Sequence, residues 1–284
     1  MSMLNKVCLI TGATSGIGQA TALALAAQGA ELFVVCRNAQ KGEALLSEIS
    51  SRYPGCVVTL LLADLGCLAD IRRVAQQFLD TGKPLHLLMN NAGVVNTHRK
   101  LSSDGIEETF AVNHLAYVLL TELLRERIVQ SAPARIVSVA SAAYLFVKGV
   151  QFDDLEFVNT PYKTFKVYGH SKLCNILWTR HLAKQLDGTG VTVNCVHPGP
   201  VNTGLGHQDH AMIGKIIGLI LKPFFRTPTQ GAATSIFVAT SPSLDTVSGE
   251  YFSDSKVKPV KAWAKDDDSA ERLWQVSKDY LKIA

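Results

Sequence analysis

Short runs of β-branched and aliphatic residues alternate along this chain with segments whose apolar residues recur at three- and four-residue steps. The first pattern predicts strands and the second predicts helices. The predicted strands are Val7 to Ile10, Glu31 to Val35, Val57 to Leu62, Leu85 to Met89, Arg135 to Val139 and Val191 to Val196. Between the first two strands the helical step is clear, and Gly29 stands where a helix would end.

Strands that alternate with helices in this way favour parallel pairing with right-handed crossovers. Strands that are apolar along their whole length fit a sheet covered on both faces. The chain has 284 residues, and no Pro-, Gly- or Ser-rich linker divides it. We therefore expect α/β architecture over residues 1–284: a single doubly wound, Rossmann-type domain whose mostly parallel sheet has about seven strands, with helices on both faces.

The composition is that of a folded protein, with 47% hydrophobic and 18% charged residues. The net charge of +4 is mild, and apart from a loose cluster near the end the lysines are scattered. That cluster consists of Lys256, Lys258, Lys261 and Lys265. This cluster does not make up a basic face, so no nucleic-acid partner is expected.

The six cysteines show no C-x-x-C or paired metal spacing, and several lie in apolar runs. Reduced thiols in a reducing compartment are the simplest interpretation. The first predicted strand begins at Val7, which leaves no room before it for a signal peptide or membrane anchor, and the apolar stretch from Met212 to Phe225 is too short to span a bilayer. We therefore expect a cytoplasmic protein without a transmembrane segment.

A glycine-rich turn, Thr11-Gly12-Ala13-Thr14-Ser15-Gly16-Ile17-Gly18, joins the first strand to the first helix. Glycines there let the backbone turn tightly and approach a phosphate, while the helix N-terminus offers free N–H groups. The spacing is one residue longer than G-x-G-x-x-G, and an ordinary βα turn is the alternative. Its place after the first strand favours a dinucleotide site with contacts from Gly12, Thr14, Ser15, Gly16, Ile17 and Gly18.

The second strand is followed by Cys36-Arg37, with Lys41 one turn on, where an NAD-preferring site would present Asp or Glu. Arginine matches a ribose 2′-phosphate in charge and geometry, so the sequence predicts NADP(H), with NAD(H) less favoured; a plain surface arginine is the alternative. Ligands of open α/β sheets bind at the carboxyl ends of strands. The further contacts predicted at those ends are Asp64 and Leu65 after the third strand, and Asn91, Ala92 and Gly93 after the fourth.

Tyr168 and Lys172 stand four residues apart, a spacing that puts phenol and ammonium on one face of a helix. A positive charge beside a tyrosine favours the phenolate, so a group with an ordinary pKa of about 10 would exchange protons near neutrality. Such pairs also occur by chance on helix surfaces. The same chain contains the glycine-rich turn and a serine upstream of the pair, for which we prefer Ser141 to Ser138. Together these features favour a catalytic acid/base that works with a hydride-carrying nucleotide.

These motifs, in this order, resemble the short-chain dehydrogenase/reductase family over essentially the whole chain, and most closely its retinol dehydrogenase-like branch. The resemblance rests on the glycine-rich turn, Asn90-Asn91-Ala92-Gly93, Asn113, Ser141, Tyr168 with Lys172, and His197-Pro198-Gly199-Pro200-Val201-Asn202-Thr203. Further support comes from Val35-Cys36-Arg37, the insert from Ala142 to Val167, and Ser248 to Asp254. One departure is Ala116-Tyr117, where that branch tends to have glycine and histidine.

The resemblance implies a role for each matching residue. Tyr168 would exchange the proton with a carbonyl or alcohol oxygen, Lys172 would hold the nicotinamide ribose and lower the tyrosine pKa, and Ser141 would hydrogen-bond the substrate oxygen. Asn113 would support a water that relays protons to Lys172. Pro198, Gly199, Val201 and Thr203, together with Tyr168 and Lys172, would contact the cofactor.

The segment at about 200–228 is expected to cover the substrate. Its apolar residues, from Met212 to Phe225, favour an apolar aldehyde or ketone and its alcohol, and leave open peripheral contact with lipid, packing on the core or a subunit interface. Family members often form homo-oligomers. His207 and His210 lack the further ligands of a zinc site, so no metal is expected. Alternative functions are turnover of a steroid or a conjugated double bond, and NADP(H) sensing without catalysis.

Overall fold

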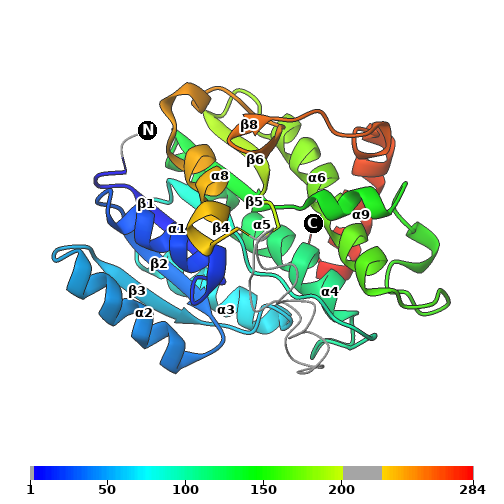
Figure 1. The fold of residues 1–284 in the computed structure, drawn as a ribbon, viewed down its shortest axis with the longest axis horizontal. Coiled ribbons are helices and arrows are strands. Elements are labelled where there is room, and N and C mark those ends of the chain that lie inside the picture. The colour runs from blue at the N-terminus through cyan, green and yellow to red at the C-terminus, as the bar shows by residue number, and fades with distance from the viewer. Residues whose placement is uncertain (1–2, 201–225, 284) are drawn as a thin grey trace.

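The computed structural model describes residues 3–200 and 226–283. Its centre is an eight-stranded sheet in the order β3-β2-β1-β4-β5-β6-β7-β8, with helices on both faces (Figure 1). The strands are β1 Val7–Thr11, β2 Glu31–Cys36, β3 Val58–Leu62, β4 Leu87–Asn90, β5 Ala134–Val139, β6 Val191–His197, β7 Tyr251–Ser253 and β8 Lys256–Val257. All neighbours pair in parallel except β7 and β8.

The helices with three or more turns are α1 Gly16–Ala26, α2 Ala39–Arg52, α3 Leu68–Asp80, α5 Ala116–Gln130, α6 Thr164–Gln185, α8 Pro228–Thr240 and α9 Asp267–Leu281. Shorter helical elements near the site are α4 Glu108–Phe110, the π-helical turn η1 Ala111–Leu115, and the 3-10 turns η2 Ala142–Phe146 and η3 Phe152–Asp154. Among the described residues, none of these helices is both long and apolar enough to cross a bilayer.

Each face of the sheet has its own hydrophobic core, because successive side chains of a strand point to opposite faces. In β1, Val7 and Leu9 belong to the core that also contains residues of α3, α5, α6 and α9, whereas Cys8 and Ile10 belong to the core that contains residues of α1, α2 and α8. This explains why the buried strands read as continuous apolar runs. The expected doubly wound α/β fold is confirmed.

The sheet has one strand more than the predicted seven or so. The six predicted strand ranges correspond to β1 to β6, so neither β7 nor β8 is among them. β7 has three residues; β8 has only two residues, both exposed, and pairs antiparallel with β7. Because it has no apolar run, hydrophobic pattern alone gives no signal for it.

The strand order reverses between β1 and β4: the chain runs outward from β1 to β3 and returns to β4 on the other side. At such a switch point the connections leave in opposite directions, so a crevice opens at the carboxyl ends of the strands. The glycine-rich turn follows β1, and the Asn91 segment follows β4. The fold therefore brings together two motifs that are about eighty residues apart in sequence.

Candidate active site

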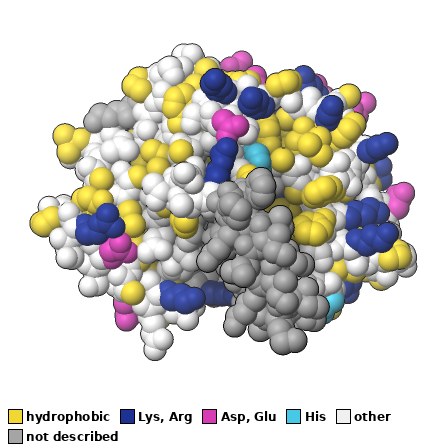
Figure 2. All heavy atoms as spheres, viewed as in Figure 1, with side chains coloured by type: hydrophobic (Ala, Val, Ile, Leu, Met, Phe, Trp, Pro, Cys, Tyr) yellow, Lys and Arg dark blue, Asp and Glu magenta, His cyan; other side chains and the backbone are white. Residues whose placement is uncertain are grey.

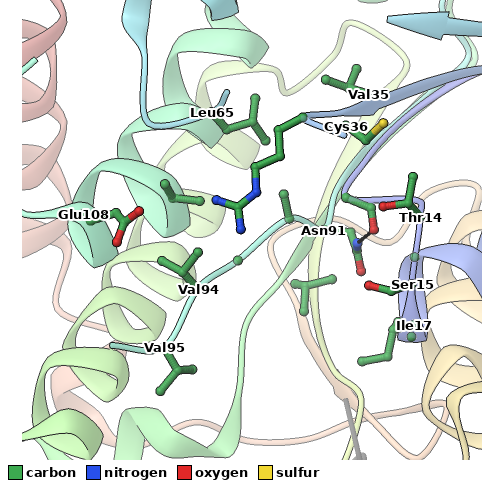
Figure 3. Close-up of a pocket in the computed structure, with 18 of the residues that line it drawn as sticks. Thr14, Ser15, Ile17, Val35, Cys36, Leu65, Asn91, Val94, Val95 and Glu108 are labelled. Atoms are coloured by element: carbon green, nitrogen blue, oxygen red, sulfur yellow. Dashed lines mark hydrogen bonds between the residues drawn. The ribbon is translucent and has the colours of Figure 1, made fainter. Parts of the chain in front are cut away.

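A cavity of about 490 Å³ lies at this switch point, a volume in the usual range for small-molecule sites. Figure 3 shows Thr14, Ser15 and Ile17 on one side of it and Val94, Val95 and Glu108 on the other. Within the described chain, every predicted site residue except Asn113 lines it. These residues are Gly12, Thr14, Ser15, Gly16, Ile17, Gly18, Arg37, Lys41, Asp64, Leu65, Asn91, Ala92, Gly93, Ser141, Tyr168, Lys172, Pro198 and Gly199.

Some of the sequence predictions lie outside the described residues. They are Val201 and Thr203, the histidines His207 and His210, and the apolar segment from Met212 to Phe225.

Two glycines of the turn are required by geometry. Gly12 has a φ of +67°, and a Cβ built there would lie 2.8 Å from the Ala92 Cα. A Cβ at Gly18 would collide with the Gly12 carbonyl oxygen and lie 2.5 Å from the Asn91 Nδ2. The turn and the segment after β4 therefore touch backbone to backbone, and the first turn of α1 faces the cavity with its N–H groups.

Thr11 and Asn91 hold this contact together. The Asn91 Nδ2 donates to the carbonyls of Thr11 at 2.8 Å and Gly12 at 3.2 Å. In return the Thr11 Oγ1 accepts from the backbone N–H groups of Asn91 at 3.0 Å and Ala92 at 3.1 Å. Thr11 was not predicted as a site residue; its only signal in the sequence is a polar residue at the end of a buried strand, next to the first glycine.

Two basic residues lie on the far side of the cavity, after β2. Arg37 and Lys41 are exposed, and the side chain of Asn38 caps the start of α2 by accepting from the Lys41 N–H at 2.9 Å. The first turn of α2 has no acidic residue. The carboxylate of Asp64, after β3, accepts from the Gly66 N–H at 2.8 Å, so one of its oxygens already has a partner.

Tyr168 and Lys172 lie one turn apart on α6, as predicted. Lys172 is buried, and its Nζ donates to the Val139 carbonyl at 2.8 Å. The ammonium lies 5.5 Å from the centre of the Tyr168 ring and 5.6 Å from that of Tyr117, distances at which a cation interacts with a ring face.

The pKa values of this pair are set mainly by burial, which disfavours the charged form of each group. Burial lowers the pKa of Lys172 to about 7. Burial also raises the pKa of Tyr168 to about 12, against a smaller lowering by the side chain of Ser141. The sequence predicts that the ammonium lowers the tyrosine pKa toward neutrality. In the protein alone this prediction is wrong, because removing the phenol from water has a larger effect on its pKa than its neighbours have.

Ser141 and Ser138 occupy different environments. Ser141 is the N-cap of η2 and lines the cavity, and its Oγ accepts from the Ala143 N–H at 3.1 Å. Ser138 lies within β5, is fully buried and does not line the cavity. The geometry therefore agrees with the choice of Ser141.

Asn113 lies in the π-helical turn η1, behind the wall of the cavity. Its Oδ1 accepts from the Val94 N–H at 2.7 Å, and its Nδ2 donates to the Val94 carbonyl at 3.0 Å and to the Ser171 Oγ at 3.1 Å. π-turns often mark functional sites. The side chain of Asn113 is thus committed to holding the segment after β4 that lines the cavity, while its backbone carbonyl accepts from Asn175 at 2.8 Å.

Four buried residues around the pair were missed by sequence reasoning. Asn175 and Tyr117 contact the groups already described: Asn175 bonds Asn113, and the Tyr117 hydroxyl donates to the Ala92 carbonyl at 2.7 Å. His114 and Ser277 continue the network from Asn175 toward α9. Asn175 stands three residues after Lys172 and His114 directly follows Asn113, which are the only signals the sequence offers for them.

Comparison with known proteins identifies the family of this chain. The family model described as short chain dehydrogenase matches residues 6–153 and 156–213. Retinol dehydrogenase 12 of Mus musculus is 44% identical over 278 residues, which cover 98% of this chain and 87% of that protein. Retinol dehydrogenase 11 of Homo sapiens is 41% identical over 278 residues, covering 98% of this chain and 86% of that protein.

A solved structure supports the same relationship. A short chain dehydrogenase from Burkholderia cenocepacia J2315, in complex with NADP, superposes with a TM-score of 0.71 at 25% identity, covering 89% of this chain and 97% of that one. Fold, motif order and sequence identity thus agree. The chain is an oxidoreductase of the short chain dehydrogenase family, and within it belongs with the retinol dehydrogenase-like proteins.

Proposed function

We propose that this protein is an NADP(H)-dependent oxidoreductase that interconverts an apolar aldehyde or ketone and its alcohol. The observation that carries the proposal is that Ser141, Tyr168 and Lys172 line the same cavity as the glycine-rich turn. A nucleotide held on the turn and a carbonyl group held by the serine and tyrosine would therefore meet in one space.

The fit of a dinucleotide rests on the chain's own geometry. The contact that Gly12 and Gly18 make with the segment after β4 leaves no room for a Cβ, and the start of α1 offers backbone donors suited to phosphate. When bound, a reduced nicotinamide supplies the hydride. The residues that would hold the dinucleotide are those of the turn, Arg37 and Lys41, and the segment from Asn91 to Gly93.

Tyr168 would handle the proton. Its pKa of about 12 keeps the hydroxyl protonated at neutral pH, as a donor to a carbonyl oxygen must be. Ser141 would donate a hydrogen bond to the same oxygen, stabilising the negative charge that grows there. The phenolate left behind would lie beside the Lys172 ammonium, whose charge favours it.

A preference for NADP(H) follows from charge. Arg37 and Lys41 line the cavity after β2, and the first turn of α2 carries no carboxylate to accept from a ribose hydroxyl. The Burkholderia relative, by its description, binds NADP. We expect Arg37→Ala to weaken NADPH about ten- to hundredfold and NADH much less. Arg52→Ala, at the other end of α2, is the matched control; an unchanged ratio of the two affinities would reject the preference.

The substrate class rests on the relatives and on the apolar composition of the segment expected to cover the site. The relatives compared are named for retinol. Screening NADPH oxidation against retinal, other apolar aldehydes, ketones and steroids tests the class directly. Turnover confined to small polar carbonyls would contradict it, and turnover of a steroid or a conjugated double bond would favour those alternatives.

The assignment of Tyr168 is tested by Tyr168→Phe. Removing the hydroxyl should reduce kcat by at least about a hundredfold while leaving NADPH binding, followed by cofactor fluorescence, nearly unchanged. Tyr53→Phe, which directly follows the C-terminal end of α2 and lies outside the cavity lining, is the control. Equal turnover in Tyr168→Phe and the parent would reject the assignment, and NADPH binding without any turnover in the parent would favour a sensing protein.

A further inference from the structure

Tyr117 is a buried phenol that contacts both Lys172 and the segment after β4. It lies in the first turn of α5, directly after the π-helical turn η1, and does not line the cavity itself. The Lys172 Nζ stands over its ring, 5.6 Å from the ring centre. Its hydroxyl donates to the Ala92 carbonyl at 2.7 Å. One side chain behind the cavity wall therefore joins the lysine to the wall.

The ring of Tyr117 is one of two that attract the Lys172 ammonium. The other is the ring of Tyr168, whose centre lies 5.5 Å from the same Nζ. A ring face attracts a cation through its π electrons, most strongly where water is excluded, and Lys172 is buried. Together with the Val139 carbonyl, 2.8 Å from the Nζ, the two rings stabilise the charge.

No carboxylate helps to stabilise this charge. Figure 2 shows the common situation of Lys and Arg side chains, which stand out from the surface into solvent, some of them beside Asp or Glu. Lys172 forms no ion pair within the described chain, and burial is the only cause of its lowered pKa. Because a buried charge without an opposite charge is costly, the attraction of a ring counts for more here than on the surface.

The titratable neighbours of Lys172 are neutral near pH 7. Burial raises the pKa of Tyr117 well above that of an ordinary phenol and the pKa of Tyr168 to about 12, and it lowers the pKa of His114 to about 3. The groups that face the lysine are Tyr117 from α5, Tyr168 from α6, His114 from η1, Val139 from β5 and Gly93 from the segment after β4. A change in the Lys172 charge near neutral pH is therefore not caused by the ionisation of these neighbours.

The hydroxyl of Tyr117 fixes the cavity wall at Ala92. That residue touches the glycine-rich turn, because a Cβ at Gly12 would lie 2.8 Å from the Ala92 Cα. The Ala92 N–H donates to the Thr11 Oγ1 at 3.1 Å, and the Ala92 carbonyl accepts from Tyr117. Both backbone groups of Ala92 are thus held, one from β1 and the other from α5.

We propose that Tyr117 is a positioning residue for the reaction: its ring keeps Lys172 cationic, and its hydroxyl fixes the wall of the cofactor site at Ala92. The effect on turnover rests on the proposed function. The two contacts do not, because each can be measured without turnover.

Two substitutions separate the ring from the hydroxyl. Tyr117→Phe keeps the ring and removes the donor to Ala92, whereas Tyr117→Leu removes both. The titration of Lys172 is followed by NMR of the full chain, isotope-labelled at the lysine Cε carbons. Its signal is identified as the one that is absent from Lys172→Arg. Cofactor fluorescence measures the affinity for NADPH.

The ring should determine the titration of Lys172. In Tyr117→Phe we expect the lysine to titrate near pH 7, as in the parent. In Tyr117→Leu we expect a midpoint about one pH unit lower, equivalent to about 1.4 kcal/mol of lost attraction, because the ring favours the charged form. The decline of kcat/KM with rising pH should move to lower pH by the same amount, a change that loss of packing alone would not produce.

The hydroxyl should determine part of the cofactor affinity. Both variants leave the buried Ala92 carbonyl without its donor, so NADPH binding should weaken about three- to tenfold in each. Leu124→Ala is the matched control, because Leu124 is buried two turns further along α5. It should cost stability and change neither the Lys172 titration nor the affinity for NADPH. If Tyr117→Leu does not fold, Tyr117→Met replaces the ring with a flexible chain of similar volume.

Three results would overturn the proposal. A Lys172 midpoint in the ring-free variant that is equal to the parent's or higher would show that the ring does not hold the charge. Parent-like NADPH affinity in Tyr117→Phe would show that the hydroxyl does not fix the wall. Shifts of the same size in Leu124→Ala would assign both effects to lost packing.

This proposal and the proposed function fail separately. A chain that turns over no carbonyl compound, but whose Lys172 titration moves with the Tyr117 ring, retains the role of Tyr117 and loses the proposed function. A chain that reduces apolar carbonyls with the same Lys172 titration in every variant does the reverse.

Discussion

Lys172 and Asn175, neighbours on one face of α6, donate to the same acceptor, the backbone carbonyl of Val139. The Lys172 Nζ lies 2.8 Å from that oxygen and the Asn175 Nδ2 lies 3.5 Å from it. The same Nδ2 donates to the Asn113 carbonyl at 2.8 Å. One amide therefore joins the end of β5, the π-turn η1 and the helix that carries Tyr168.

The network continues to the C-terminal helix through His114. Its Nδ1 lies 3.2 Å from the Asn175 Oδ1 and its Nε2 lies 3.1 Å from the Ser277 Oγ. Burial lowers the pKa of His114 to about 3, so the ring is neutral and has one N–H. Because the Asn175 Oδ1 can only accept, the single N–H of His114 is on Nδ1, and its Nε2 accepts from the Ser277 hydroxyl. The Leu273 carbonyl, 2.7 Å from the Ser277 Oγ, competes for the same hydroxyl proton.

Replacing Asn175 by alanine tests whether this amide positions the catalytic lysine. The change removes the donor to Asn113 and the acceptor for His114, leaving buried polar groups without partners. We expect a loss of about 1–3 kcal/mol in the free energy of unfolding and a decrease in kcat of about tenfold, with little change in KM.

Cys174→Ala is the control for this variant, because Cys174 is buried at the preceding position of the same helix. It should cost stability without lowering kcat. If both variants lower kcat in proportion to their loss of stability, Asn175 serves the fold alone and has no positioning role.

The pH dependence of carbonyl reduction should follow Lys172. Burial lowers its pKa to about 7, so the side chain is cationic below that pH and neutral above it. The cation stabilises the phenolate that remains after Tyr168 gives up its proton. We therefore expect kcat/KM, which reports ionisations of the free enzyme, to fall as pH rises through about 7.

Lys172→Arg separates this effect from other ionisations. A guanidinium stays charged throughout the accessible pH range, so the variant, though slower because the longer group fits the buried site poorly, should not show the decline near pH 7. A decline at the same pH in both proteins would assign it to another group.

Sequence alone predicted those features that are encoded locally. The observed bounds of β1 and β5 lie within one residue of the predicted ones, because both strands are buried along their length and most of their residues are apolar. The glycine-rich turn and the spacing of Tyr168 and Lys172 are likewise local patterns. The chain's membership in its family could be inferred from them.

The features that sequence missed depend on contacts between distant segments. His114 meets Ser277 across 163 residues, and neither lies in a motif that predicts the meeting. The raised pKa of Tyr168 has the same origin, since it comes from burial, a property of the folded chain. β8 was missed for a different reason: a two-residue, exposed strand has no hydrophobic pattern.

Gly18→Ala should disrupt the cofactor site more than the fold. The added methyl would meet the Gly12 carbonyl and the Asn91 Nδ2, and a backbone oxygen cannot move aside as a flexible side chain can. We expect NADPH binding to weaken at least about tenfold and the free energy of unfolding to fall by about 1–3 kcal/mol.

Gly149→Ala is the matched control for that change, because a Cβ there has no heavy atom within 4 Å. Fluorescence titration with NADPH and thermal unfolding measure both quantities. NADPH affinity in Gly18→Ala equal to that of Gly149→Ala would show that the close contact between the glycine-rich turn and the segment after β4 is not needed for the cofactor.

His114 should also make the protein sensitive to acid. In the unfolded chain a histidine titrates near pH 6.5, whereas burial lowers the pKa of folded His114 to about 3. Between these values the unfolded state binds the extra proton, so stability is full above pH 6.5 and is lost as the pH falls, by up to about 1.4 kcal/mol per pH unit for this group.

The variant His114→Gln has no such proton to bind. Urea unfolding between pH 7 and 4 should therefore show a shallower loss of stability for the variant, although it is less stable at pH 7 because part of the network is gone. His98→Gln, which removes an exposed histidine, should keep the parent slope. Parallel slopes for the parent and His114→Gln would mean that the acid sensitivity arises elsewhere, for instance at His170, whose pKa burial lowers to about 4.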